Sequence, residues 1–220
     1  MERKVIFIPG VGADERAFSQ LEIKGAFKKV YANWIPLQSS GMSFESYCIR
    51  LTEHYKIDRE DILIGLSFGG LVAQQIGRTL ENQHVILLSS FRNRKDLRNI
   101  WNLALRMKLY KLLPSQKIRF IVDVASLFLH TWRRRSGSVL KEMLSDADFK
   151  LIKWSLRMIE RSDLSDSYKS GYLSLVGDKD LLIKQWSDSQ MKINGGSHFM
   201  VHDKADLVAK QIENYLNSTS

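Results

Sequence analysis

The sequence predicts an α/β fold in which helices cover both sides of a mostly parallel sheet. Short apolar runs alternate along the chain with segments whose apolar residues recur at helical spacing, and this alternation is typical of parallel sheets. The chain has 220 residues, of which 44% are hydrophobic and 26% charged, as in ordinary globular domains. This composition excludes a disordered or collagen-like protein, and one large domain accounts for the length.

About six strands are expected from the apolar runs. The first, residues 5–8, reads Val-Ile-Phe-Ile and is stopped by Pro9-Gly10, a pair that marks a turn. Continuous apolar character predicts a strand buried on both faces. The other expected strands are residues 30–35, 62–64, 85–88, 172–176 and 190–193.

Amphipathic helices are expected between these strands. Apolar residues follow one helical face in residues 44–55, 68–80 and 207–216. The alternation stops in residues 91–170, which show helical spacing and no strand pattern. The sequence therefore predicts a sheet core made of residues 1–90 and 171–220, with residues 91–170 as a helical insertion.

Positive charge is concentrated in this insertion. The whole chain carries a net charge of +9, and residues 92–135 contain twelve basic and two acidic residues, so the rest of the chain sums to −1. A basic surface of this kind is either a solvated face or a site for an anionic group of a substrate or for weak contact with acidic lipid. Nucleic acid is not expected, because aromatic residues for base stacking are sparse and no nucleic-acid-binding fold is recognisable.

Residues 65–70 read Gly-Leu-Ser-Phe-Gly-Gly and lie between an expected strand and an expected helix. This is the Gly-x-Ser-x-Gly pattern in the strand-to-helix context that it requires. Ser67 would occupy a sharp turn, and Gly65 and Gly69 would leave room where a side chain would collide with neighbouring backbone. The Ser67 hydroxyl would then face a helix N-terminus, whose free N–H groups stabilise negative charge.

A serine needs a base in contact and an acid that orients the base before it becomes a good nucleophile. The expected strand 172–176 runs into Gly177-Asp178-Lys179-Asp180, and His198 follows a glycine-rich loop after the last expected strand. These loops belong to the edge of the sheet where open parallel sheets bind ligands. By position alone, Asp178 and Asp180 both remain candidates for the acid.

The serine–acid–histidine order and the glycine-flanked serine resemble the α/β-hydrolase family. The resemblance implies an α/β-hydrolase fold, with Ser67 as nucleophile, Asp180 as acid and His198 as base. It also implies that the main-chain N–H groups of Val11 and Phe68 receive the oxyanion, that residues 91–170 form a cap, and that no cofactor is bound. The first strand departs from the family, because Pro9-Gly10-Val11-Gly12 stands where the family commonly has His-Gly.

The expected function is hydrolysis of a carboxylic ester or thioester of a small acyl substrate, through an acyl-enzyme on Ser67. Two alternatives stay open: a lyase or C–C hydrolase that uses the same residues as an acid–base set, and a catalytically silent binding protein with a basic cap. No metal is expected, because the chain has one cysteine, Cys48, and five scattered histidines. No secretory or membrane-spanning segment is visible, so a cytoplasmic protein is expected. The oligomeric state has no sequence signal.

Overall fold

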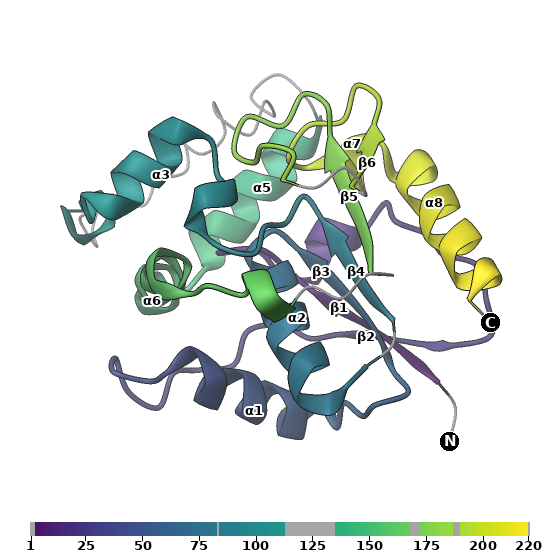
Figure 1. The fold of residues 1–220 in the computed structure, drawn as a ribbon, viewed down its shortest axis with the longest axis horizontal. Helices are drawn as coiled ribbons and strands as arrows, with labels where there is room; N and C mark the ends of the chain where they lie inside the picture. Colours follow the sequence, from purple (N-terminus) through teal and green to yellow (C-terminus); the bar gives the residue numbers. More distant parts are fainter. Residues whose placement is uncertain (1–2, 83, 113–134, 168–171, 187–189, 220) are drawn as a thin grey trace.

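A parallel sheet of six strands forms the centre of the fold, as predicted (Figure 1). The computed structural model describes residues 3–82, 84–112, 135–167, 172–186 and 190–219. The strand order is β2-β1-β3-β4-β5-β6, and every neighbouring pair is parallel. The strands are β1 Lys4–Ile8, β2 Lys28–Tyr31, β3 Ile62–Leu66, β4 Val85–Leu88, β5 Leu173–Gly177 and β6 Met191–Ile193.

The second strand differs from the prediction of residues 30–35. It begins earlier and ends at Tyr31, which pairs with Phe7 of β1. β1 ends at Ile8, and the following Pro9 has no N–H to offer a neighbouring strand. The apolar residues after Tyr31 therefore leave the sheet and pack beside it. β2 is an edge strand, and its exposed Lys28 and Lys29 discourage pairing with another chain.

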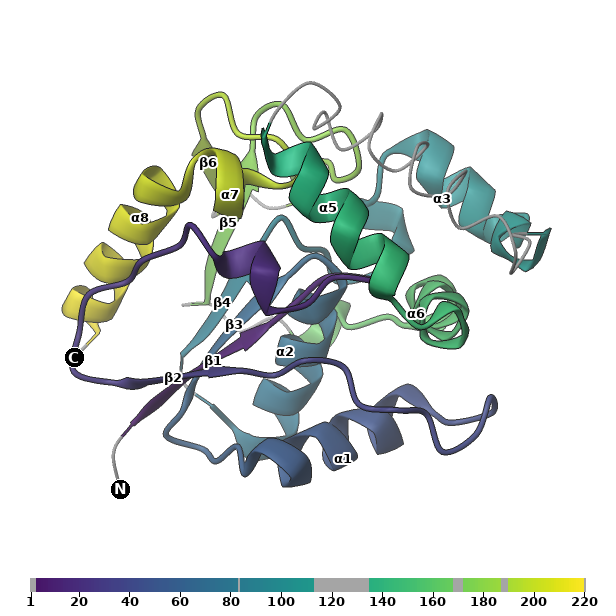
Figure 2. The same cartoon turned by 180° about the vertical axis from the view of Figure 1, so that it is seen from behind.

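Helices cover both faces of the sheet (Figures 1 and 2), and alternate residues of β1 belong to two different apolar clusters. In β1, Ile6 and Ile8 join one apolar cluster and Val5 and Phe7 the other, because side chains alternate across a strand. The first cluster includes buried residues of α1 (Phe44–Tyr55), α2 (Phe68–Leu80) and α6 (Phe149–Arg161). The second includes those of α5 (Arg135–Asp146), α7 (Met200–Asp203) and α8 (Ala205–Ser218).

The described part of residues 91–170 is helical. It contains α3 (Asn99–Arg106), α5 and α6, with 3-10 turns at Arg94–Asp96, Leu109–Leu112 and Ser165–Ser167. Its helices serve both apolar clusters: Trp154 of α6 belongs to the first, and Met143 of α5 belongs to the second. Helices α6 and α5 are thus packed into the core of the molecule on opposite faces of the sheet. Within the described residues, each helix is too short or too polar to cross a bilayer.

Candidate active site

Ser67 occupies the one-residue junction between β3 and α2. β3 ends at Leu66, α2 begins at Phe68, and Ser67 has φ 53° and ψ −118°. A positive φ is strained for a residue with a side chain, so the neighbourhood must hold it in place. The Ser67 N–H donates to the Leu88 carbonyl at 2.9 Å, and the Ser67 carbonyl accepts from the Ser90 hydroxyl at 2.8 Å. The turn is therefore anchored to the end of β4.

The glycines on either side of Ser67 are required by close backbone approach. A Cβ added to Gly65 would lie 2.4 Å from the Gly69 carbonyl oxygen, and one added to Gly69 would lie 2.1 Å from the carbonyl oxygen of Ile8. Real Cβ atoms do not come this close to backbone oxygens. The two glycines thus allow the backbone of the Ser67 turn to pack closely against the end of β1 and the start of α2.

His198 lies between β6 and α7 and reaches back to the serine turn. Its Nε2 is 3.0 Å from Ser67 Oγ, although the two residues are 131 positions apart, and its Nδ1 is 2.9 Å from Asp180 Oδ2. An ionised carboxylate only accepts hydrogen bonds, so Nδ1–H donates to Asp180 and Nε2 is left to accept from the Ser67 hydroxyl. The structure brings these three predicted residues together at the carboxyl edge of the sheet.

The loop that carries His198 is held against the end of β5. A Cβ on Gly177 would lie 2.1 Å from the Gly196 carbonyl oxygen, so only glycine allows the two backbones to touch. The Ser197 hydroxyl donates to Asp203 at 2.9 Å and accepts from the Phe199 N–H at 3.1 Å. These bonds fix the backbone on both sides of the imidazole.

Asp180 is almost fully buried, and both of its carboxylate oxygens are occupied. Oδ2 faces His198, and Oδ1 accepts from the N–H groups of Leu182 at 2.8 Å and Ile183 at 3.0 Å. Burial alone would raise the pKa of Asp180, but the electrostatic attraction of His198 and the hydrogen bonds from His198, Ile183 and Leu182 hold that pKa below its ordinary value. Asp180 is therefore an anion at neutral pH.

Asp178, the other acid that the sequence left open, is exposed. Its N–H donates to the Ile193 carbonyl at 3.2 Å, which ties the end of β5 to β6. Within the described residues, only Asp180 of these two aspartates contacts His198.

Residues of the insertion also hold the Asp180 loop, which the sequence analysis did not anticipate. Three consecutive carbonyl oxygens accept from Arg98 and Trp101: the Arg98 Nε–H donates to Asp180 at 2.9 Å, the Trp101 Nε1–H to Leu181 at 3.1 Å and the Arg98 N–H to Leu182 at 2.8 Å. Arg98 is one of twelve basic residues in its region, and Trp101 fits a helical stripe. Nothing in the local sequence pattern distinguishes this role.

The two predicted oxyanion donors flank the serine turn. A Cβ on Gly10 would lie 3.4 Å from Ser67 Cβ and 4.0 Å from Ser67 Oγ, so the loop after β1 passes close to the hydroxyl just before Val11. Phe68 is the first residue of α2. Within the described part of the chain, neither the Val11 nor the Phe68 N–H donates to another group. The N–H at the start of a helix such as α2 has no acceptor within the helix, so the Phe68 N–H can donate to a ligand.

The loop that carries Val11 is braced by the tryptophan that follows β2 and by the insertion. The Trp34 Nε1–H donates to the Gly10 carbonyl at 3.0 Å, and the Trp34 ring packs against Phe68 with centroids 5.5 Å apart. Gly12 has a φ of +67°, and a Cβ there would lie 2.7 Å from Leu144 of α5 and 3.3 Å from Ile152 of α6. Helices α5 and α6 therefore lie directly over this loop.

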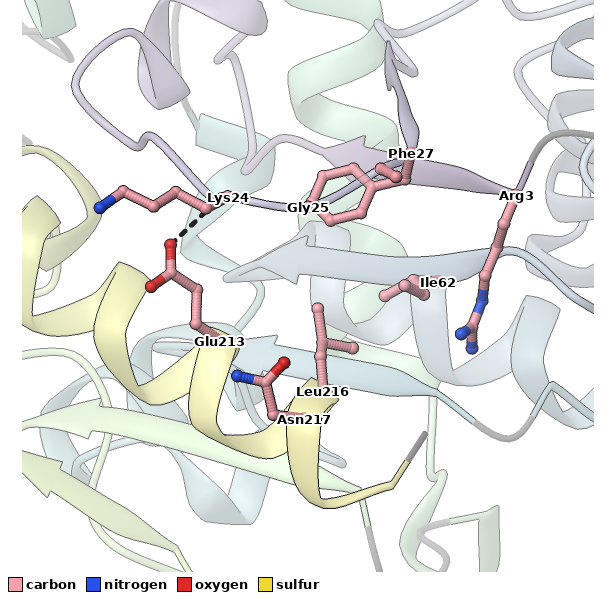
Figure 3. A pocket seen from close by; sticks show the side chains of 9 residues that line it. Arg3, Lys24, Gly25, Phe27, Ile62, Glu213, Leu216 and Asn217 are labelled. Atoms are coloured by element: carbon pink, nitrogen blue, oxygen red, sulfur yellow. Dashed lines mark hydrogen bonds between the residues drawn. The ribbon is translucent and has the colours of Figure 1, made fainter.

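Two cavities lie in different parts of the molecule. A cavity of about 240 Å³ lies between the Gly12 loop, Trp34 and helices α5 and α6. A larger cavity, of about 460 Å³, lies at the amino ends of the strands, on the far side of the sheet from Ser67. Arg3, just before β1, and Ile62, the first residue of β3, line it (Figure 3). In the described residues, no group of three His, Cys, Asp or Glu side chains could hold a metal ion.

Comparison with known proteins reveals similarity at the level of structure. No protein-family model and no curated protein sequence matches the chain. Among solved structures, a thermophilic esterase from Thermogutta terrifontis has a TM-score of 0.77 and 17% identity, over 98% of this chain and 90% of the esterase. An enol-lactonase from Burkholderia xenovorans has a TM-score of 0.76 and 14% identity, over 99% and 92% of the two chains.

A structure from a study of carboxylesterases of the thaumarchaeon Nitrososphaera gargenis has a TM-score of 0.73 and 14% identity, over 98% of this chain and 90% of that chain. At such identities the likeness concerns the fold. Nearly the whole chain takes part in it.

Proposed function

Because the chain has the α/β-hydrolase fold, we propose that it is a serine hydrolase that cleaves a carboxylic ester or thioester of a small molecule. The observation that carries this proposal is the continuous chain of contacts from Ser67 Oγ to His198 Nε2 at 3.0 Å and from His198 Nδ1 to Asp180 Oδ2 at 2.9 Å. A nucleophile, a base and an acid that orients the base are the minimum set for acyl transfer through a serine.

In the proposed acylation step, Ser67 Oγ attacks the carbonyl carbon while its proton passes to His198 Nε2. The imidazolium is stabilised by the Asp180 carboxylate, which keeps its own negative charge. The oxyanion receives hydrogen bonds from the Val11 and Phe68 N–H groups, and removal of one such donor typically costs about 3 to 4 kcal/mol of transition-state stabilisation. The tetrahedral species then collapses, and the leaving alkoxide or thiolate takes the proton from His198.

Deacylation repeats the sequence with water as the nucleophile. His198 takes a proton from water, hydroxide adds to the acyl carbon, and Ser67 Oγ leaves with the proton that His198 returns. The products are the free carboxylic acid and the alcohol or thiol, and the site is restored. No cofactor is required for any step.

We propose residues 91–170 as the cap that shapes the acyl pocket. Support comes from Leu144 and Ile152, which pack over Gly12, next to one proposed oxyanion donor. The cavity of about 240 Å³ lies between the same Gly12 loop and helices α5 and α6. The basic residues of the insertion favour substrates with an anionic group over neutral ones. A cytoplasmic location belongs to the same proposal, since the only cysteine of the chain, Cys48, is buried.

A fluorophosphonate probe tests the proposal, because it phosphonylates only a serine that a base activates. The wild-type protein should be labelled at Ser67, and Ser67→Ala should not be labelled. Ser39→Ala, which removes an exposed hydroxyl, is the matched control and should label like the wild type. Equal labelling of wild type and Ser67→Ala would refute the proposal.

Product analysis separates the proposal from acid–base chemistry at the same residues. With a panel of p-nitrophenyl esters and acyl-CoA thioesters, an acyl group trapped on Ser67 is expected by mass spectrometry. A lyase or C–C hydrolase that uses the three residues only to move protons would turn over its substrate without that adduct. Binding of a partner with no turnover anywhere in the panel would support the silent binding protein.

A further inference from the structure

The insertion presents an exposed apolar stripe, defined here as Ile100, Leu103, Met107, Leu109 and Leu112. Their exposed fractions are 63%, 55%, 62%, 43% and 78%. Of the large hydrophobic residues exposed in the described part of the chain, the four most exposed all belong to this stripe. Single exposed apolar residues are ordinary, but a concentration within thirteen residues is typical of an interaction surface.

The stripe is a separate face from the one that holds α3 on the protein. Ile100, Leu103 and Met107 are spaced i, i+3 and i+7, so they lie on one side of the helix. Leu105 is buried and Trp101 packs against the core from the other side. α3 therefore has two apolar faces, and the described residues cover only one of them.

Positive charge borders the stripe. Arg106, Lys108 and Lys111 are exposed, and residues 97–112 contain no aspartate or glutamate. Within the described residues, none of these three cations pairs with a carboxylate. Their charges are therefore available to an anionic surface, and no neighbouring charge on the same segment opposes it.

We propose that the stripe docks the protein onto the surface of an anionic lipid membrane, with Ile100, Leu103 and Met107 inserted at the headgroup boundary. Apolar residues on one face with Lys and Arg beside them are the pattern of helices that lie in a membrane interface. A protein partner fits less well, because lysine is depleted and aromatic residues are enriched at the centres of protein interfaces. Lys108 and Lys111 border the stripe, and none of its five residues is aromatic.

α3, which carries part of the stripe, lies beside the proposed active site. α3 contacts the loop of Asp180 through the Trp101 hydrogen bond to Leu181, and Leu181 is itself 36% exposed. α8 lies at the opposite end of the molecule in both views (Figures 1 and 2). Docking through the stripe would thus bring the loop of Asp180, and not α8, toward the lipid. The docking itself does not depend on the proposed hydrolysis.

Vesicle sedimentation of the full chain tests the proposal. The wild-type protein should sediment with vesicles of phosphatidylcholine mixed with phosphatidylserine, sediment much less with phosphatidylcholine alone, and be released by added salt, which screens surface charge. Equal binding to the two kinds of vesicle, or binding to neither, would overturn the proposal.

Two sets of variants separate the contributions of apolar and of charged side chains to vesicle binding. The double variant Leu103→Glu with Met107→Glu should lose at least about tenfold in partitioning. Its control is Leu207→Glu, which alters an exposed leucine of α8 and should bind like the wild type. The triple variant Arg106→Gln, Lys108→Gln and Lys111→Gln should bind on the order of 100-fold more weakly. Its control removes the exposed Lys28, Lys29 and Lys210.

Light scattering and thermal unfolding distinguish membrane docking from two other ways in which the stripe could be covered: by a second copy of the chain or by another part of the same chain. If the stripe joins two copies of the chain, the wild type will be a dimer, the Leu103→Glu, Met107→Glu variant a monomer, and neither will bind lipid. If another part of the same chain covers the stripe, this variant will unfold at a lower temperature and the triple charge variant will bind lipid like the wild type. Either result would contradict membrane docking.

Discussion

The side chain of Arg98 donates a hydrogen bond from Nε to the backbone carbonyl of Asp180, at 2.9 Å. The first residues of the insertion thereby contact the residue whose side chain orients His198. Together with the Trp101 bond to Leu181, this contact makes Arg98 and Trp101 positioning residues for the proposed reaction.

Loss of the Arg98 contact should lower kcat on a water-soluble ester by roughly three- to tenfold, since one hydrogen bond contributes about 1 kcal/mol. KM should change little, because Arg98 acts through Asp180 and not on the substrate. Arg98→Gln and Trp101→Phe should show this pattern, and Arg106→Gln, which removes an exposed arginine at the end of α3, should not. A change confined to KM would contradict the positioning role.

Replacement of Asp180 should be far more damaging than replacement of Asp178. Asp180→Ala should lower kcat/KM by about 10³- to 10⁴-fold, as loss of the orienting acid does in a serine triad. Asp178→Ala removes an exposed carboxylate and should retain most of the activity. Steady-state kinetics on one p-nitrophenyl ester compares the two variants, and an inactive Asp178→Ala would reverse the assignment.

Asp180 should also contribute to stability in a pH-dependent way. Its pKa in the folded chain is held below the ordinary value, so its contribution is present above the unfolded-state pKa of about 4 and is lost as the pH falls through the lower folded-state pKa. The difference in unfolding free energy between wild type and Asp180→Asn should therefore be largest at neutral pH and shrink below about pH 4. Urea titrations at neutral and acidic pH measure it, and a constant difference would contradict the pKa shift.

The close approach at Gly69 predicts a large effect of a single methyl group. Gly69→Ala should destabilise the chain by about 3 kcal/mol or more, because the added Cβ meets backbone oxygens that cannot rotate away. Gly41→Ala is the control, because its nearest neighbour would be the Ser39 hydroxyl at 3.9 Å. Urea denaturation should give a lower midpoint for Gly69→Ala alone.

Cys48 should not react in the native state. Its thiol is buried in the core, and burial raises its pKa well above the ordinary value, with a smaller effect from Glu45. Since the thiolate is the reactive form, Ellman's reagent should modify Cys48 only on the time scale of unfolding and rapidly in urea. Fast modification of the folded protein would show that the thiol is accessible.

Residues with strong local signals were predictable from sequence. The strand, the turn at Ser67 and the helix after it follow from the period of apolar residues and from two glycines, and the structure has them where they were expected. The predicted limits of the second strand were wrong because its end is set by Pro9, the residue that follows the neighbouring strand β1. That constraint acts through the sheet and leaves no mark on residues 30–35 themselves.

The contacts around Asp180 were beyond sequence reasoning for a related reason. The spacing left Asp178 and Asp180 open, and the choice of which one contacts His198 follows from how the loop turns after β5. That turn is held by N–H groups of Leu182 and Ile183 and by Arg98. Backbone donors have no sequence signature, and Arg98 is 82 residues from its acceptor in the chain. Such long-range pairings emerge only when the chain is folded.

The order of the strands has a consequence for biosynthesis. From β1 onward, strands β3 to β6 lie side by side in the same order as they follow in the sequence. His198 follows β6, so it meets Ser67 only when the final strand has docked. A chain still emerging from the ribosome would carry the serine turn long before the imidazole that activates it. The proposed chemistry would therefore stay silent during translation, and the nascent protein would be protected from premature acylation.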